Sequence, residues 1–92
     1  MKKLRKIAIS RGYDSQSMKL IEEMAGLTQA IVKHVVSKEK AKTLREIKHR
    51  IAAVLVMLEQ IVYLLDLDNN DIDQLMEYEI NRQLFEIKSE GA

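Results

Sequence analysis

The 92-residue chain has no cysteine and no proline, and it has only three glycines. The absence of cysteine excludes disulfides, thiolate metal sites and a cysteine nucleophile. The absence of proline and the scarcity of glycine are typical of long helices rather than of sheets or disordered segments. We therefore expect an all-α protein whose stability comes from side-chain packing.

Long hydrophobic runs are also missing. The longest strongly apolar run covers residues 51–58, which is far shorter than the roughly 20 residues of a membrane-spanning helix. The basic residues within segment 1–6 resemble the start of a secretion signal, but no sustained apolar core follows them. We therefore expect a soluble, cytoplasmic protein without a membrane partner.

An excess of charge of one sign is the third feature that the chain lacks. Fifteen basic and fourteen acidic side chains give a net charge of +1. This balance argues against nucleic-acid binding driven by phosphate neutralisation. We expect the basic cluster of Lys2, Lys3, Arg5 and Lys6 to be a solvated helix face, and we expect no nucleic-acid partner.

Apolar residues recur at three- and four-residue intervals in three segments, as in amphipathic helices. The pattern predicts long helices over residues 15–37, 43–65 and 70–87. In the first helix one stripe is expected to contain Met18, Ile21, Met24, Ala25, Thr28, Ile31, Val32 and Val35. In the third helix the residues expected to be buried are Ile72, Leu75, Met76, Ile80, Leu84 and Ile87.

Polar residues and glycine indicate where these helices begin and end. Asp14 or Ser15 is expected to cap the first long helix. Thr43 and Glu46 have the spacing of a capping box at the start of the second. The cluster at residues 68–71 predicts a turn and a cap before the third. A short helix over residues 4–9 is expected to end at Gly12.

These segments predict a single domain over residues 1–92. Short connections make consecutive long helices antiparallel, so we expect an antiparallel bundle of three long helices and a short N-terminal one. A domain of this size leaves much apolar surface uncovered. We therefore expect the chain to associate with itself as a homodimer or a higher oligomer.

Three segments carry a family resemblance. They are Gln16 with the sequence LIEEMAGLTQA at 20–30, the sequence IAAVLVMLEQ at 51–60 and the sequence YEINR at 78–82. In order, spacing and helical placement they resemble the MazG-like branch of the all-α nucleoside triphosphate pyrophosphohydrolases. The resemblance covers most of the chain. It implies a helical, dimeric fold and cleavage of nucleoside triphosphates to monophosphates and pyrophosphate.

The resemblance also implies a magnesium site, held by a Glu-Glu-x-x-Glu motif on one helix and a Glu-x-x-Asp motif on the next. Carboxylates three and four residues apart share a helix face, and magnesium prefers hard oxygen ligands. Here the first motif contains Glu22 and Glu23 but has Gly26 in place of its third acid. The second has Arg50 and Ala53 in place of both of its acids.

Other positions of the polar inner face also depart from the family. His49 is often acidic there, and Glu79 replaces a common phosphate-contacting lysine ahead of the retained Arg82. The apolar framework still matches, so we expect either a natural degenerate relative or an engineered variant. The residues of this rewritten site are Glu22, Glu23, Gly26, His49, Arg50, Ala53, Glu79 and Arg82.

Two alternative arrangements of the helices are possible at the rewritten site. Gly26 and Ala53 either oppose each other across a pocket that suits a small-molecule ligand, or they let the two helices close together. Arg50, if it faces the interior, needs Glu22 or Glu23 as a partner to avoid an unpaired buried charge.

Three functions follow from these expectations. The first is a non-catalytic MazG-like helical scaffold, with the rewritten face as a new small-molecule pocket. The second is a nucleotide pyrophosphohydrolase that binds magnesium through the residual acids Glu22 and Glu23. The third is a helical protein-interaction module. A cofactor is expected only for the second, and a catalytic role is assigned to no residue.

Overall fold

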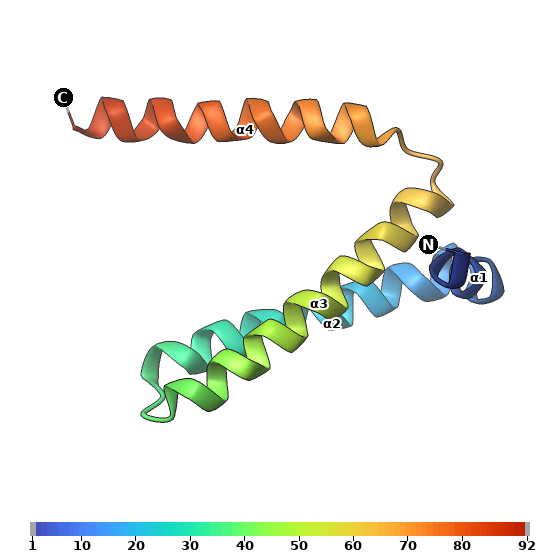
Figure 1. Cartoon of the computed structure of the whole chain (residues 1–92), viewed down its shortest axis with the longest axis horizontal. Coiled ribbons are helices and arrows are strands. Elements are labelled where there is room, and N and C mark those ends of the chain that lie inside the picture. Colours follow the sequence, from blue (N-terminus) through green and yellow to red (C-terminus); the bar gives the residue numbers. More distant parts are fainter. Residues whose placement is uncertain (1, 92) are drawn as a thin grey trace.

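The computed structural model describes residues 2–91, which form four helices and no strand. The helices are α1 (Lys2–Arg11), α2 (Tyr13–Val36), α3 (Lys40–Leu64) and α4 (Asn69–Glu90) (Figure 1). The predicted all-α fold is confirmed. Among the described residues, no helix combines the length and the apolarity that crossing a bilayer requires.

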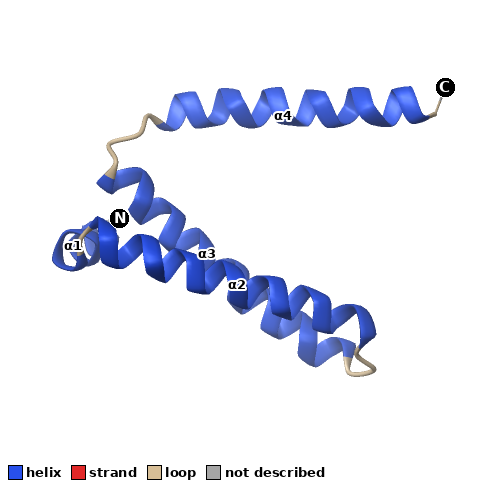
Figure 2. Cartoon of the chain, turned by 180° about the vertical axis from the view of Figure 1, so that it is seen from behind, coloured by secondary structure: helices blue, strands red, loops and turns tan. Residues whose placement is uncertain are grey.

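Helices α2 and α3 form an antiparallel hairpin, and α1 packs at its open end against both of them (Figures 1 and 2). Gly12 separates α1 from α2 and has a φ of 83°, a conformation that glycine adopts without steric cost. Its backbone N–H donates to the Ala8 carbonyl at 2.8 Å, and its own carbonyl accepts from the Gln16 N–H at 3.1 Å. The predicted end of the short helix at Gly12 is confirmed.

The predicted caps of α2 and α3 are wrong. Gly12 occupies the N-cap position of α2, and neither Asp14 nor Ser15 caps that helix. Helix α3 begins at Lys40, so Thr43 lies inside its first turn. The buried Thr43 hydroxyl lies 3.2 Å from the Lys40 carbonyl and 2.6 Å from His34 Nδ1. The Thr43 hydroxyl therefore connects α3 to α2 and does not cap α3.

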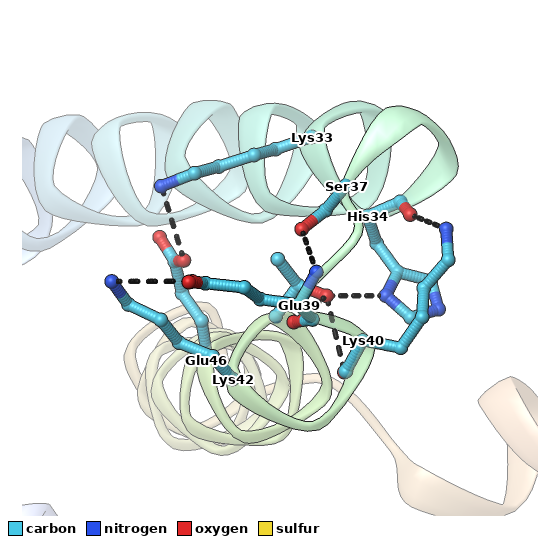
Figure 3. A network of polar contacts seen from close by, with 8 residues as sticks. Lys33, His34, Ser37, Glu39, Lys40, Lys42 and Glu46 are labelled. Atoms are coloured by element: carbon cyan, nitrogen blue, oxygen red, sulfur yellow. Dashed lines mark hydrogen bonds and ion pairs between the residues drawn. The ribbon is translucent and has the colours of Figure 1, made fainter.

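Polar contacts hold the turn between α2 and α3 (Figure 3). The Lys40 ammonium donates to the backbone carbonyls of His34 and Val35 at the end of α2. The Glu39 N–H donates to the Ser37 hydroxyl at 3.0 Å. These bonds satisfy backbone groups that a helix end leaves without partners.

The seam between α2 and α3 is more polar than the sequence pattern predicts. The buried residues of these two helices are Gln16, Ala30, Thr43, Val54, Met57 and Gln60. The predicted apolar stripe of α2 exists, but all eight of its residues are exposed in the single chain. Positions 16, 23 and 30 face α3, and at about 100° per residue the stripe lies on the far side of α2.

Helix α4 lies apart from the other three helices (Figures 1 and 2). Its predicted extent is close to the observed one, and the Asp68 carboxylate caps it by accepting from the Asn70 N–H at 2.8 Å. None of its residues is buried, so the predicted burial of its apolar face does not occur within one chain. The bundle of the single chain therefore comprises α1, α2 and α3.

Candidate functional site

The residues of the rewritten site are divided between two places. Three lie on α2 and three on α3, where the hairpin brings them onto one side. The other two, Glu79 and Arg82, lie on α4 away from the hairpin (Figure 1). The hairpin residues are Glu22, Glu23, Gly26, His49, Arg50 and Ala53.

Glu23 lies between two cations on this side of the hairpin. Its Oε2 is 3.9 Å from Arg50 Nη1 on α3, and its Oε1 is 3.6 Å from Lys19 Nζ one turn earlier on α2. The Glu23 side chain is only 16% exposed, whereas that of Arg50 is 41% exposed. Arg50 is therefore only partly buried, and the acid of α2 that lies beside it is Glu23.

Gly26 provides the space in which Arg50 lies. A Cβ atom added at Gly26 would be 2.8 Å from Arg50 Nη1 and 3.1 Å from its Cζ. The three nearest atoms to that position all belong to the guanidinium group. The space beside Gly26 is therefore filled by Arg50, and it is not an open pocket shared with Ala53.

A hollow does lie beside Ala53, one turn further along α3. Its volume is about 330 Å³. Its lining combines apolar side chains with polar ones at its edge, and it consists of Lys19, Glu23, His49, Ala52, Ala53, Val56 and Met57. Three residues of the rewritten site, Glu23, His49 and Ala53, therefore meet here.

The residual acids do not fit a magnesium ion. The Glu23 carboxylate already has two cations within 4 Å, one from each helix. The Glu22 carboxylate is largely exposed, 4.0 Å from Lys19 Nζ. Within residues 2–91, the acidic and histidine side chains form no group of three or more that could hold a metal. A dication at Glu23 would have to displace Lys19 and Arg50, which repel it.

Arg82 is engaged by its own helix. Its Nε donates to both carboxylate oxygens of Glu79 at 3.1 Å, and its Nη1 donates to Glu86 Oε1 at 2.6 Å. The hydrogen bond from Arg82 lowers the pKa of Glu79, and the same bond raises the pKa of Arg82. Glu79 and Arg82 therefore form an ion pair on α4.

Sequence reasoning missed a second polar contact in the hairpin. Gln16 Nε2 donates to Gln60 Oε1 at 2.6 Å, and both side chains are buried. A hollow of about 610 Å³ adjoins this pair where α1 meets the hairpin. A heptad signal was available only on α2, where Gln16 and Glu23 are seven residues apart; on α3 the same spacing from Arg50 leads to Met57 and not to Gln60.

Comparison of the chain with protein-family models, with curated proteins and with solved structures gave no match.

Proposed function

We propose that the chain is a non-catalytic, MazG-like helical scaffold in which an ion pair has replaced a magnesium site. The observation that supports this function is the position of the Arg50 guanidinium. It lies against Gly26, and its Nη1 is 3.9 Å from Glu23 Oε2. A positive charge at this place opposes the binding of a second cation. The proposal applies equally to a natural degenerate relative and to an engineered variant.

The hollow beside Ala53 is the place where we expect a small-molecule ligand of this scaffold. Ala52, Ala53 and Val56 offer it apolar contacts. His49 and Lys19 at the edge offer hydrogen-bond donors. This combination of apolar contacts with a few polar groups is typical of ligand sites.

Restoring the family acids tests the loss of the magnesium site. The triple variant Gly26→Glu, Arg50→Glu and Ala53→Asp returns three carboxylates to one face of the hairpin. We expect calorimetry to show magnesium binding to this variant and not to the native chain. Pyrophosphate release from the four common nucleoside triphosphates is measured on both proteins, and the native chain is expected to release none.

A matched variant controls for the change in net charge. Gln29→Glu, Ala41→Asp and Arg45→Glu add the same charge at exposed positions of the same two helices. This control is expected to bind magnesium no better than the native chain. A tight one-to-one magnesium isotherm of the native chain would contradict the proposal, whether or not the restored variant folds.

We also propose that the scaffold is a homodimer or a higher oligomer. Large apolar side chains on α2, α3 and α4 are exposed in the single chain, among them Ile21, Leu55 and Ile80. Monomeric proteins rarely expose apolar patches of this extent. Sedimentation equilibrium of the native chain is expected to show an oligomer, and a folded monomer at micromolar concentration would refute this part of the proposal.

A further inference from the structure

We propose that α4 of one copy packs on the apolar side of the α2–α3 hairpin of a second copy, so that two chains exchange their C-terminal helices. This inference rests on the proposed self-association and specifies its contact. It combines four observations: the apolar stripe of α4, the turn before α4, the apolar side of the hairpin and the charges of the two parts.

Helix α4 has an apolar stripe that nothing covers in the single chain. Ile72, Met76, Ile80 and Leu84 follow one another at four-residue intervals, and the Ile80 side chain is 57% exposed. Most helical stability in proteins comes from packing of an apolar face, and the α4 stripe has no such packing in the single chain. The 22 residues of α4 therefore need a covering surface.

The turn between α3 and α4 directs α4 away from its own hairpin. Asp66 has a φ of 52°, its N–H donates to the Tyr63 carbonyl, and the Leu67 N–H donates to the Val62 carbonyl at 3.0 Å. These two bonds form a Schellman motif, which fixes the end of α3. The Asp68 cap then fixes the start of α4 directly afterwards. With this turn, α4 lies away from its own hairpin (Figures 1 and 2), and a second copy can cover α4 without any change in the turn.

The hairpin offers an apolar side of matching length. On α2 it contains Met24, Ile31 and Val35, and on α3 it contains Ile51 and Leu58, all of them exposed. At roughly 1.5 Å per residue, α4 is about 33 Å long and the two hairpin helices are about 36 Å long. The covering surface can therefore extend along the whole of α4.

Apolar residues of both helices lie on the same side of the hairpin. Lys19 of α2 and His49 of α3 both line the hollow beside Ala53, so this side of the hairpin has polar residues from both helices. On both helices, rotation from the seam at about 100° per residue leads to the hollow in one direction and toward the apolar stripe in the other. Most of the α2 stripe lies on the far side of that helix, but Met24 and Ile31 lie nearer the seam on the side opposite the hollow, where one helix can contact both α2 and α3.

The two parts also have complementary charge. Helix α4 carries six acidic and two basic side chains, a net charge of −4, whereas residues 2–68 carry thirteen basic and eight acidic ones, a net charge of +5. Asp73 and Glu77 each directly follow a residue of the α4 stripe, and Lys48 lies one turn from Leu44 and Ile51 on α3. Opposite charges beside an apolar contact favour pairing of α4 with a hairpin over pairing with another α4.

Cysteine cross-linking tests the contact directly, because the native chain has no cysteine. One pool carries Ile80→Cys, and a second pool carries a size tag with either Ile31→Cys or Ile51→Cys. The pools are unfolded, mixed, refolded and treated with a short bismaleimide. We expect a cross-linked product that contains one tagged and one untagged chain.

A matched pool carries Asn81→Cys, which lies next to Ile80 on the other face of α4. It is expected to give several-fold less mixed product. A further variant carries Ile80→Cys and Ile31→Cys in one chain and is diluted with native chains. Cross-links confined to single chains of this variant would show that α4 packs on its own hairpin, and this result would overturn the inference.

Sedimentation of the same proteins distinguishes the inference from the proposed self-association. An oligomer that forms without the mixed cross-link would refute the exchange of α4 and leave self-association standing. A folded monomer would refute both.

Discussion

The side-chain amides of Gln16 and Gln60 hydrogen-bond across the α2–α3 seam at 2.6 Å, with exposed fractions of only 5% and 2%. An amide buried between two helices must find a partner, because its desolvation is not otherwise compensated. Only one alignment of α2 along α3 brings these two residues together. The pair therefore helps to define the register of the hairpin, together with Glu23 and Arg50 two turns further along.

Removal of one partner should cost more than removal of both. Gln60→Ala leaves the Gln16 amide buried and unpaired, and we expect a loss of about 1–3 kcal/mol in the free energy of unfolding. The double variant Gln16→Leu, Gln60→Leu removes both polar groups and fills their volume, so it should be nearly neutral. Urea denaturation at a fixed protein concentration measures both changes.

Gln29→Ala is the control for this comparison. Gln29 is exposed on the same helix as Gln16, and substitutions at such surface positions usually change stability by less than about 0.5 kcal/mol. If Gln60→Ala costs no more than Gln29→Ala, the amide pair makes no contribution to the stability of the hairpin.

Gly26→Ala should stabilise α2. Alanine is favoured over glycine inside a helix by about 1 kcal/mol. The added Cβ would approach the Arg50 guanidinium to 2.8 Å, but the end of this long side chain can move aside. The Arg50 side chain is 41% exposed and its Nη1 lies 3.9 Å from Glu23 Oε2, so we expect this contact to contribute less than the helix gains. Thermal denaturation is expected to show a higher Tm, and a lower Tm would mean that the guanidinium cannot move.

The helix ends show why the sequence predicts this fold unevenly. Gly12 and Asp68 act within their own turns, so the end of α1 and the cap of α4 could be predicted from local residue types. Thr43 could not, because its hydroxyl contacts His34 on another helix. Local rules assign a threonine near a helix start to a cap, whereas burial of Thr43 against α2 selects a different role.

The side of α2 that faces α3 was less predictable from the sequence than the two ends of the helix. An apolar stripe marks the side of a helix that is covered in the functional state, but it does not identify the covering element. In the single chain α3 contacts the side with Gln16 and Glu23, and it leaves Ile21 and Val32 exposed. For Arg50 the sequence offered Glu22 or Glu23 as partners, and only the packing of α2 on α3 selects Glu23.

The ion pair on α4 should make the titration of Glu79 sensitive to Arg82. The hydrogen bond from Arg82 lowers the pKa of Glu79 below its usual value of 4.5. The pKa of Glu79 is lower in the folded chain than in the unfolded chain. The contribution of this ion pair to stability is therefore complete above the unfolded pKa and is lost as the pH falls through the folded pKa. NMR titration of Arg82→Gln is expected to return the pKa of Glu79 toward 4.5. Lys88→Gln, which removes another cation of α4, should leave it unchanged.

The apolar stripe of α4 should carry the affinity between subunits. Ile80→Asp places a charge in the stripe, and Asn81→Asp adds the same charge on the neighbouring face. Burial of an isoleucine side chain contributes about 1.5–3 kcal/mol, so Ile80→Asp should weaken association at least about tenfold. Sedimentation equilibrium is expected to show this shift toward monomer for Ile80→Asp and not for Asn81→Asp. Equal dissociation of both variants would mean that the added charge weakens association from either face, and that Ile80 makes no specific apolar contact.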